Sequence, residues 1–220
     1  MISIARNPRN EVVLDQFHGS ESVLDIGCVQ HDANRATNEH WLHGELAREV
    51  DSLVGMDLLA EEVEKLNNRG YDVIHGNAES FSLDRSFDAV VAGELIEHLA
   101  NPGSFLKCAR SHLYDDGQLI LTTPNPWYSR RFAEAATGHV RCNPEHTAWF
   151  DEQTLRQLLA RYDFTPEIIR YTPAPRFKPR YASMNIESHF TNVIYRMGFR
   201  LLGGYSLVVV ATPSSSAHHD

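Results

Sequence analysis

Carboxylate and amide side chains recur where short apolar runs end in the first half of this 220-residue chain. Asp25 lies in the run 23–26, which Gly27 interrupts, and Asp57 lies near the end of the run 52–58. Later runs are followed by Asn77, Glu79 and Glu94. Carboxylates accept hydrogen bonds and amides both donate and accept them, so these residue types suit a ligand that carries hydroxyl and amino groups.

Asp25 is the unusual member of this set, because a carboxylate inside a buried strand is costly unless it is paired. It either braces the turn at Gly27 or faces a ligand at the end of its strand. The sequence leaves both interpretations open.

Hydrophobic periodicity predicts the elements that position these residues. Apolar runs closed by Gly, Pro or an acid predict strands at 22–27, 52–58, 71–78, 87–94, 118–123, 166–172 and 205–211. Helical spacing predicts helices at 10–17, 33–50, 61–69, 102–113, 154–161 and 185–202. Their alternation predicts an α/β fold with a doubly wound, mostly parallel seven-stranded sheet. We expect an antiparallel last strand at the sheet edge, a turn at 115–117 and an irregular segment at 124–144.

The polar residues meet at one edge of such a sheet, because right-handed crossovers bring the carboxyl ends of parallel strands together. An acid at Asp57, about thirty residues after Gly27, is placed to accept hydrogen bonds from both hydroxyls of a ribose. Asn77 and Ala78 can bracket an adenine, with the Asn carbonyl accepting from the exocyclic amine. The spacing therefore predicts an adenosine-containing ligand.

The fingerprint GxGxxG is absent from the first turn. Only Gly27 is present, and Val29 and His31 stand where further glycines are expected. A pyrophosphate cradle is therefore not predicted, which weighs against a nicotinamide-dependent oxidoreductase.

Composition limits the partners and the compartment. A net charge of −9 disfavours nucleic acid and anionic membrane surfaces as general partners. The three cysteines, Cys28, Cys108 and Cys142, lack CxxC spacing, which favours a reducing compartment and no structural zinc. No signal peptide or transmembrane run is recognised. We therefore expect a cytoplasmic protein with one domain over 1–213 and a disordered tail at 214–220.

Five motifs, in order, resemble those of class I S-adenosylmethionine-dependent methyltransferases: VLDIGC, VGMD, GNAESF, FDAVVAGELIEHLANPGSFL and LILTTPN. The resemblance is strong over 22–125, the expected cofactor-binding core, and looser over 145–164. It implies the Rossmann-like fold of that family, with S-adenosylmethionine as cofactor and S-adenosylhomocysteine as product. It also implies methyl transfer to an O, N or C atom of a small-molecule acceptor.

The same resemblance assigns the cofactor to the strand ends. It places the methionine part and the sulfonium beside the first turn and the end of the fourth strand, the ribose after the second strand and the adenine after the third. The residues implied are Asp25, Gly27, Cys28, His31, Asp57, Leu58, Asn77, Ala78, Glu79, Gly93 and Glu94. The loop GCVQHD departs from the usual GxGxG, so a non-catalytic module that binds an adenosyl cofactor or a partner stays as the alternative function.

Catalysis of transfer to a hydroxyl needs a base, and histidine suits this role near neutral pH. His146 is the first candidate, because the family's substrate loop meets the cofactor edge there; His98 and Glu97 follow, and His139 is fourth. The alternative is that His146 only pins its loop. No catalytic metal is expected, because His40 and His43 lack a third ligand.

Two segments are expected on the substrate side, at 126–150 and 173–203. The first is either a lid over the acceptor or a solvated loop. The second can shape acceptor choice, support a dimer or rest on a membrane, and packing of its apolar residues into the core is favoured over membrane contact. Whether the protein is a monomer or a homodimer stays open.

Overall fold

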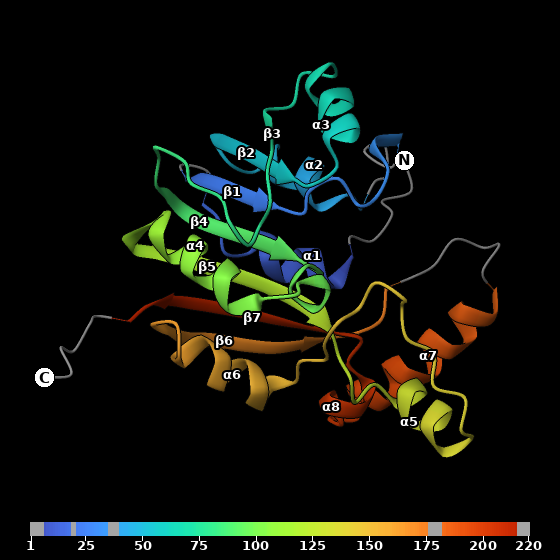
Figure 1. Ribbon diagram of the computed structural model, residues 1–220. Helices are drawn as coiled ribbons and strands as arrows, with labels where there is room; N and C mark the ends of the chain where they lie inside the picture. The colour runs from blue at the N-terminus through green and yellow to red at the C-terminus, as the bar shows by residue number, and fades with distance from the viewer. Residues whose placement is uncertain (1–6, 19–20, 35–39, 176–181, 215–220) are drawn as a thin grey trace, which may run out of the picture.

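The computed structural model describes residues 7–18, 21–34, 40–175 and 182–214. A seven-stranded sheet in the order β3-β2-β1-β4-β5-β7-β6 forms its centre, with helices on both faces (Figure 1). The strands are β1 (Ser22–Ile26), β2 (Ser52–Asp57), β3 (Val73–His75), β4 (Phe87–Gly93), β5 (Leu113–Pro124), β6 (Phe164–Thr172) and β7 (Ser206–Pro213). The helices are α1 (Pro8–Leu14), α2 (Leu42–Leu46), α3 (Ala60–Asn67), α4 (Pro102–Ser111), α5 (Ser129–Ala136), α6 (Glu152–Ala160), α7 (Ala182–Arg196) and α8 (Arg200–Gly203), with a 3-10 turn, η2, at Ile96–His98.

The strand directions confirm the predicted mixed sheet. β1 pairs in parallel with β2 and β4, and the parallel set extends to β3 and β5. β7 is antiparallel to both of its neighbours, β5 and β6. The parallel strands therefore end at one common edge, as the sequence predicts.

The prediction that the last strand lies at the sheet edge is wrong, because β7 lies between β5 and β6. The backbone of β7 is hydrogen-bonded on both sides, to β5 and to β6, and its residues from Leu207 to Ala211 are buried. β6 takes the edge instead, and its exposed Thr165, Glu167 and Arg170 suit contact with water.

The two faces of the sheet carry separate apolar clusters. Val23 and Ala89 pack with α1 and α2 on one face, whereas Leu24 and Ile26 pack with α4 and α6 on the other. Because side chains alternate along a strand, Asp25 shares the face of Val23 and points toward α2. This alternation decides the position of Asp25.

Several predicted boundaries change for local reasons. The helix predicted at 33–50 is reduced in the described residues to α2, because Trp41 is extended and its indole donates to the Cys28 carbonyl at 2.7 Å. The turn predicted at 115–117 is wrong: those residues form an irregularity within β5, where the register against β4 shifts. Within the segment predicted to be irregular, 129–136 forms α5.

The helix predicted at 185–202 is interrupted. Gly198 has φ +97°, a left-handed conformation that ends α7 and separates it from α8. Core packing of this segment was expected, but Ile186, Phe190 and Met197 are exposed. Residues 176–181 of the segment expected at 173–203, and most of the tail expected at 214–220, lie outside the described residues. In the part of the chain that the structure describes, no helix is long and apolar enough to cross a membrane.

Candidate functional site

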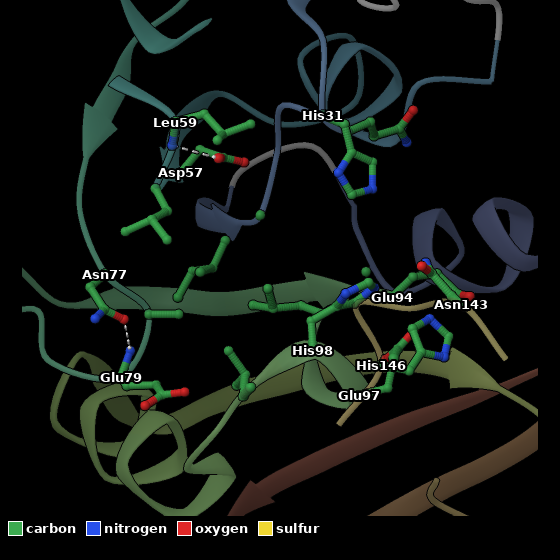
Figure 2. Close-up of a pocket in the computed structure, with 18 of the residues that line it drawn as sticks. His31, Asp57, Leu59, Asn77, Glu79, Glu94, Glu97, His98, Asn143 and His146 are labelled. Carbon is green, nitrogen blue, oxygen red and sulfur yellow. Dashed lines mark hydrogen bonds between the residues drawn. The ribbon is translucent and has the colours of Figure 1, made fainter. Parts of the chain in front are cut away.

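A cleft of about 950 Å³ lies at the carboxyl ends of β1, β2 and β4. Of the predicted site residues, it is lined by Gly27, His31, Asp57, Leu58, Asn77, Ala78, Glu79, Gly93, Glu94, Glu97, His98 and His146. Figure 2 shows Asp57 and Asn77 toward one end, and Glu97, His98 and His146 toward the other. The structure therefore brings most of the predicted residues into one cavity.

Three predicted residues, Asp25, Cys28 and His139, do not line this cleft. Asp25 is only 3% exposed, and its Oδ2 lies 2.9 Å from Nδ1 of the buried His43. Asp25 thus braces α2 against β1 beneath the turn. Of its two interpretations, this matches the structural role and not the role of facing a ligand. Cys28 is buried beside Asp25 and Asp57, and burial with these two charges strongly raises the pKa of its thiol.

Asp57 is held at the end of β2 by two backbone donors. Its Oδ2 accepts from the Val29 N–H at 2.9 Å, and its Oδ1 accepts from the Leu59 N–H at 3.1 Å. Each carboxylate oxygen can accept more than one hydrogen bond, so both oxygens keep capacity for two ligand hydroxyls. The same carboxylate also fixes the loop after β1, because Val29 belongs to that loop.

The loop after β1 keeps a glycine-type backbone without the usual glycines. Gly27 has φ +79°, and its N–H donates to the Met56 carbonyl at 2.8 Å. Gln30 and His31 follow with φ of +55° and +69°. Non-glycine residues are strained in this left-handed conformation, and strained residues are common at functional sites. His31, where a glycine was expected, therefore adopts the left-handed conformation that a glycine would take.

Asn77 and Glu79 line the cleft just after the end of β3. The Asn77 Oδ1 accepts from the Glu79 N–H at 2.9 Å, as Figure 2 shows, which closes a tight turn after β3. The Glu79 Oε1 accepts from the Asn101 N–H at 3.0 Å, which ties this turn to the start of α4. Asn77 therefore holds this turn through its side-chain oxygen and also lines the cleft.

At the other end of the cleft, the rings of His98 and His146 meet edge to face, with centroids 4.6 Å apart. Glu97 is buried, its Oε2 accepts from the Thr123 hydroxyl at 3.0 Å, and its Oε1 has no hydrogen-bond partner among the described residues. Burial first, and then the charge of Glu94, raise the pKa of Glu97 to about 8. Glu97 therefore carries a proton near neutral pH.

Hydrogen bonds of Thr147 hold the loop that carries His146 in place. The Thr147 N–H donates to the Glu97 carbonyl at 2.8 Å, and the Thr147 hydroxyl donates to the Leu99 carbonyl at 2.7 Å. The Nδ1 of His146 is buried without a partner in the described part of the chain. Burial, and then electrostatic interactions with His98 and Arg131, lower the pKa of His146, so its ring is neutral at pH 7 and can accept a proton.

These groups also offer one donor atom each to a cation: the donor atoms of Glu97, His98 and His146 lie within 4.8 Å of one another. The sequence suggested no such group, because His146 is distant in the chain from the other two. Proximity of donors is common without an ion, and the expectation of no catalytic metal stays a prediction.

The structure adds lining residues that the sequence did not single out: Arg9, Ile26, Gln30, Leu59, Gly76, Leu95, Leu99, Ala100, Asn143 and Tyr205. The Nη1 of Arg9, from α1, lies 3.6 Å from the Glu94 Oε1. Tyr205 precedes β7, and the antiparallel direction of β7 beside β5 brings this residue to the cleft edge. Only the strand order could have indicated Tyr205.

A family profile described as a methyltransferase domain matches residues 5–167. The chain belongs to the class I S-adenosylmethionine-dependent methyltransferases. Over 106 residues, 48% of this chain, it is 26% identical to (S)-tetrahydroprotoberberine N-methyltransferase of Eschscholzia californica. Over 117 residues, it is 32% identical to the mitochondrial ubiquinone biosynthesis O-methyltransferase of Schizosaccharomyces pombe. These matches span 30% and 39% of the relatives, so the chain matches about a third of their length.

Solved structures share the fold of this chain. A Haloferax volcanii methyltransferase in complex with the Trm112 methyltransferase activator aligns with a TM-score of 0.67 at 15% identity, covering 96% of this chain and 90% of that one. Magnesium protoporphyrin IX methyltransferase from Synechocystis, solved with bound S-adenosylhomocysteine, aligns with a TM-score of 0.62 at 14% identity, covering 93% and 82%. At these identities the likeness shows the fold alone.

The cleft of this methyltransferase fits the family's cofactor. Its volume lies near the upper end of the range for small-molecule sites, roughly 300–1,000 Å³. Asp57 offers two carboxylate oxygens for ribose hydroxyls, and Gly27 brings backbone to the cavity without a Cβ. Arg9 adds a cationic group that suits a carboxylate.

We expect Asp57→Ala to weaken S-adenosylhomocysteine binding at least tenfold, because charge-assisted hydrogen bonds contribute roughly 1.5–3 kcal/mol each. Isothermal titration calorimetry measures the dissociation constant. The matched control is Asp72→Ala, which removes an exposed carboxylate that does not line the cleft. An Asp57→Ala dissociation constant equal to that of the wild type would contradict the ribose assignment.

We expect Asn77→Asp to bind S-adenosylhomocysteine about as well as the wild type and Asn77→Leu to bind it more weakly. Aspartate keeps the oxygen that accepts from the Glu79 N–H and can also accept from an amine, whereas leucine keeps neither function. The same calorimetry compares the two variants. Equal affinities for both would show that residue 77 does not contact the adenine.

We expect the stability of the protein to depend on pH through Glu97. The pKa of Glu97 is raised in the folded state, so its favourable contribution is complete below the unfolded pKa of about 4.5 and is lost as the pH rises through about 8. Glu97→Gln should therefore gain stability relative to the wild type between pH 5.5 and pH 8.5. Urea denaturation at both pH values measures the difference, with the exposed Glu61→Gln as control; a constant difference would contradict the buried, protonated Glu97.

Proposed function

We propose that this protein transfers a methyl group from S-adenosylmethionine to an O, N or C nucleophile of a small-molecule acceptor. The observation that carries the proposal is the arrangement of the cleft, with carboxylate and amide groups at one end and a histidine pair with a buried acid at the other. The alternative is a non-catalytic module with the same fold.

The acceptor class is supported by two kinds of observation. The relatives named above are an N-methyltransferase and an O-methyltransferase, and their names indicate small organic acceptors. The net charge of −9 disfavours nucleic acid as an acceptor. Neither observation identifies the acceptor atom, so the proposal covers O, N and C nucleophiles.

S-adenosylmethionine, when bound, supplies a methyl group that its sulfonium already activates. The main task of the chain is therefore to hold the acceptor in line, and orientation of this kind can lower a barrier by several kcal/mol. Asp57 and Asn77 bind the adenosyl side, Gly27 approaches the methionine part, and Arg9 and His31 contact the carboxylate of that part. Thr147 fixes the wall at the acceptor end.

His146 serves as the general base in this proposal. Its pKa is lowered, so the ring is neutral and can take a proton from an acceptor hydroxyl. His98 supports the His146 ring edge to face. Protonated Glu97 has a hydrogen to donate through its second oxygen, which is buried and has no partner in the described residues.

Calorimetry with S-adenosylhomocysteine and with NAD tests the cofactor, and transfer of label from methyl-labelled S-adenosylmethionine into a metabolite extract tests the reaction. We expect binding of S-adenosylhomocysteine, no binding of NAD and a labelled small molecule. Binding without any labelled product would favour the non-catalytic module, and failure to bind S-adenosylhomocysteine would overturn the proposal.

We expect His146→Ala to lower turnover by about 10²–10⁴-fold with unchanged affinity for S-adenosylhomocysteine, as loss of a general base predicts. Thr147→Val removes the hydroxyl bond to Leu99 and should raise the acceptor KM more than it lowers kcat. Steady-state kinetics on the identified acceptor separate the two effects. If His146→Ala changed only KM, His146 would be a loop pin and not a base.

A further inference from the structure

Helix α7 lies on the protein with its polar face inward. Ser188 and Thr191 are buried, and the Thr191 hydroxyl is hydrogen-bonded to the Tyr128 hydroxyl at 2.9 Å. The Asn192 side chain bonds both the N–H and the carbonyl of Ala174, and the Tyr195 hydroxyl donates to the Tyr171 carbonyl at 2.8 Å. These bonds fix the rotation of α7 about its own axis.

The opposite face of α7 is apolar and exposed. Ile186, Phe190 and Val193 are spaced four and three residues apart and are 74%, 65% and 42% exposed, and Met197, just after the helix, is 68% exposed. The strip continues past Gly198 with Phe199, Leu201 and Leu202, which are all exposed. An amphipathic helix normally buries this face, so a contiguous exposed strip marks a docking surface.

The elements around this strip are basic in an acidic protein. Residues 129–144 and 182–203 carry five arginines, Arg130, Arg131, Arg141, Arg196 and Arg200, against two glutamates, Glu134 and Glu187, while the whole chain has a net charge of −9. Both glutamates are ion-paired with Arg130 or Arg131. Within the described residues, Arg141, Arg196 and Arg200 form no ion pair, so these two segments keep positive charge, although Asp151 and Glu152 line a pocket together with Leu201.

We propose that the exposed apolar strip from Ile186 to Leu202 docks the protein on an anionic lipid surface. Basic amphipathic helices bind lipid by burying their apolar face roughly 5–10 Å into the headgroup region, while arginines contact acidic headgroups. A stable protein–protein interface uses about 20–30 residues on each side, far more than this strip of one helix and a short turn offers. The narrow strip and its positive surroundings therefore favour lipid over a second copy of the chain.

The position of the strip relates it to the cleft. Figure 1 shows α5, α7 and α8 together beyond the strand ends, and α5 is tied to α7 by the ion pair of Arg130 with Glu187. α5 leads along the chain to Asn143 and His146, and α8 leads to Tyr205, all of which line the cleft. A protein docked through this strip would hold the acceptor end of its cleft near the lipid. The docking does not require the proposed methyl transfer.

The test is sedimentation of the full chain with vesicles of phosphatidylcholine alone or mixed in equal parts with phosphatidylglycerol. We expect partition onto the mixed vesicles that weakens with added salt. Phe190→Ser combined with Met197→Ser should lower the partition coefficient at least tenfold, because both side chains lose apolar burial. The paired variant Arg196→Gln and Arg200→Gln should lower it about fivefold for each arginine.

The exposed Tyr114→Ser is the matched control, because Tyr114 lies on β5 and outside the strip. Calorimetry with S-adenosylhomocysteine checks that each variant is folded, since none of these residues lines the cleft. Absence of wild-type binding to mixed vesicles, or equal binding by the serine variant, would overturn the proposal. A dimer in light scattering that the serine variant converts to a monomer would also overturn it and assign the strip to a second copy.

Discussion

The carboxylate of Asp57 joins the ends of β1 and β2, two neighbouring strands on which the site is built. It accepts from the Val29 N–H in the loop after β1 and from the Leu59 N–H at the end of its own strand. The Gly27 N–H adds a bond to the Met56 carbonyl in β2. With these bonds the loop after β1 holds the left-handed backbone of Gln30 and His31 without the additional glycines that usually permit it. The shape of the cofactor end of the cleft depends on this connection.

At the acceptor end of the cleft, burial and nearby charges together set the protonation states of the side chains. Glu97 is buried beside Glu94, which favours its protonated form, while burial and neighbouring cations favour the neutral form of His146. The two residues come from distant parts of the chain and are held together by Thr147, whose backbone and side chain bond the backbone around η2. A raised pKa at Glu97 next to a lowered pKa at His146 is a pair of perturbed values, and perturbed pKa values cluster at sites that transfer protons.

The sequence by itself determined much of the fold and of the cofactor end. Apolar runs closed by Gly, Pro or acids located all seven strands, and because parallel strands end at one edge, the same pattern placed Asp57, Asn77 and Glu94 in one cleft. Local patterns suffice for these residues, since each follows directly from the end of its own strand. The sequence also predicted the antiparallel direction of the last strand.

Only the tertiary structure decided which way Asp25 points, where β7 lies in the sheet and which face of α7 is exposed. The side-chain alternation of β1 turns Asp25 toward His43 and away from the cleft, and the position of β7 beside β5, antiparallel to it, brings Tyr205 to the site. The hydrophobic pattern of α7 predicts core packing, but hydrogen bonds from its polar residues to Tyr128, Ala174 and Tyr171 turn the apolar face outward. Each of these outcomes depends on partners far away in the chain, and a local pattern contains no information about them.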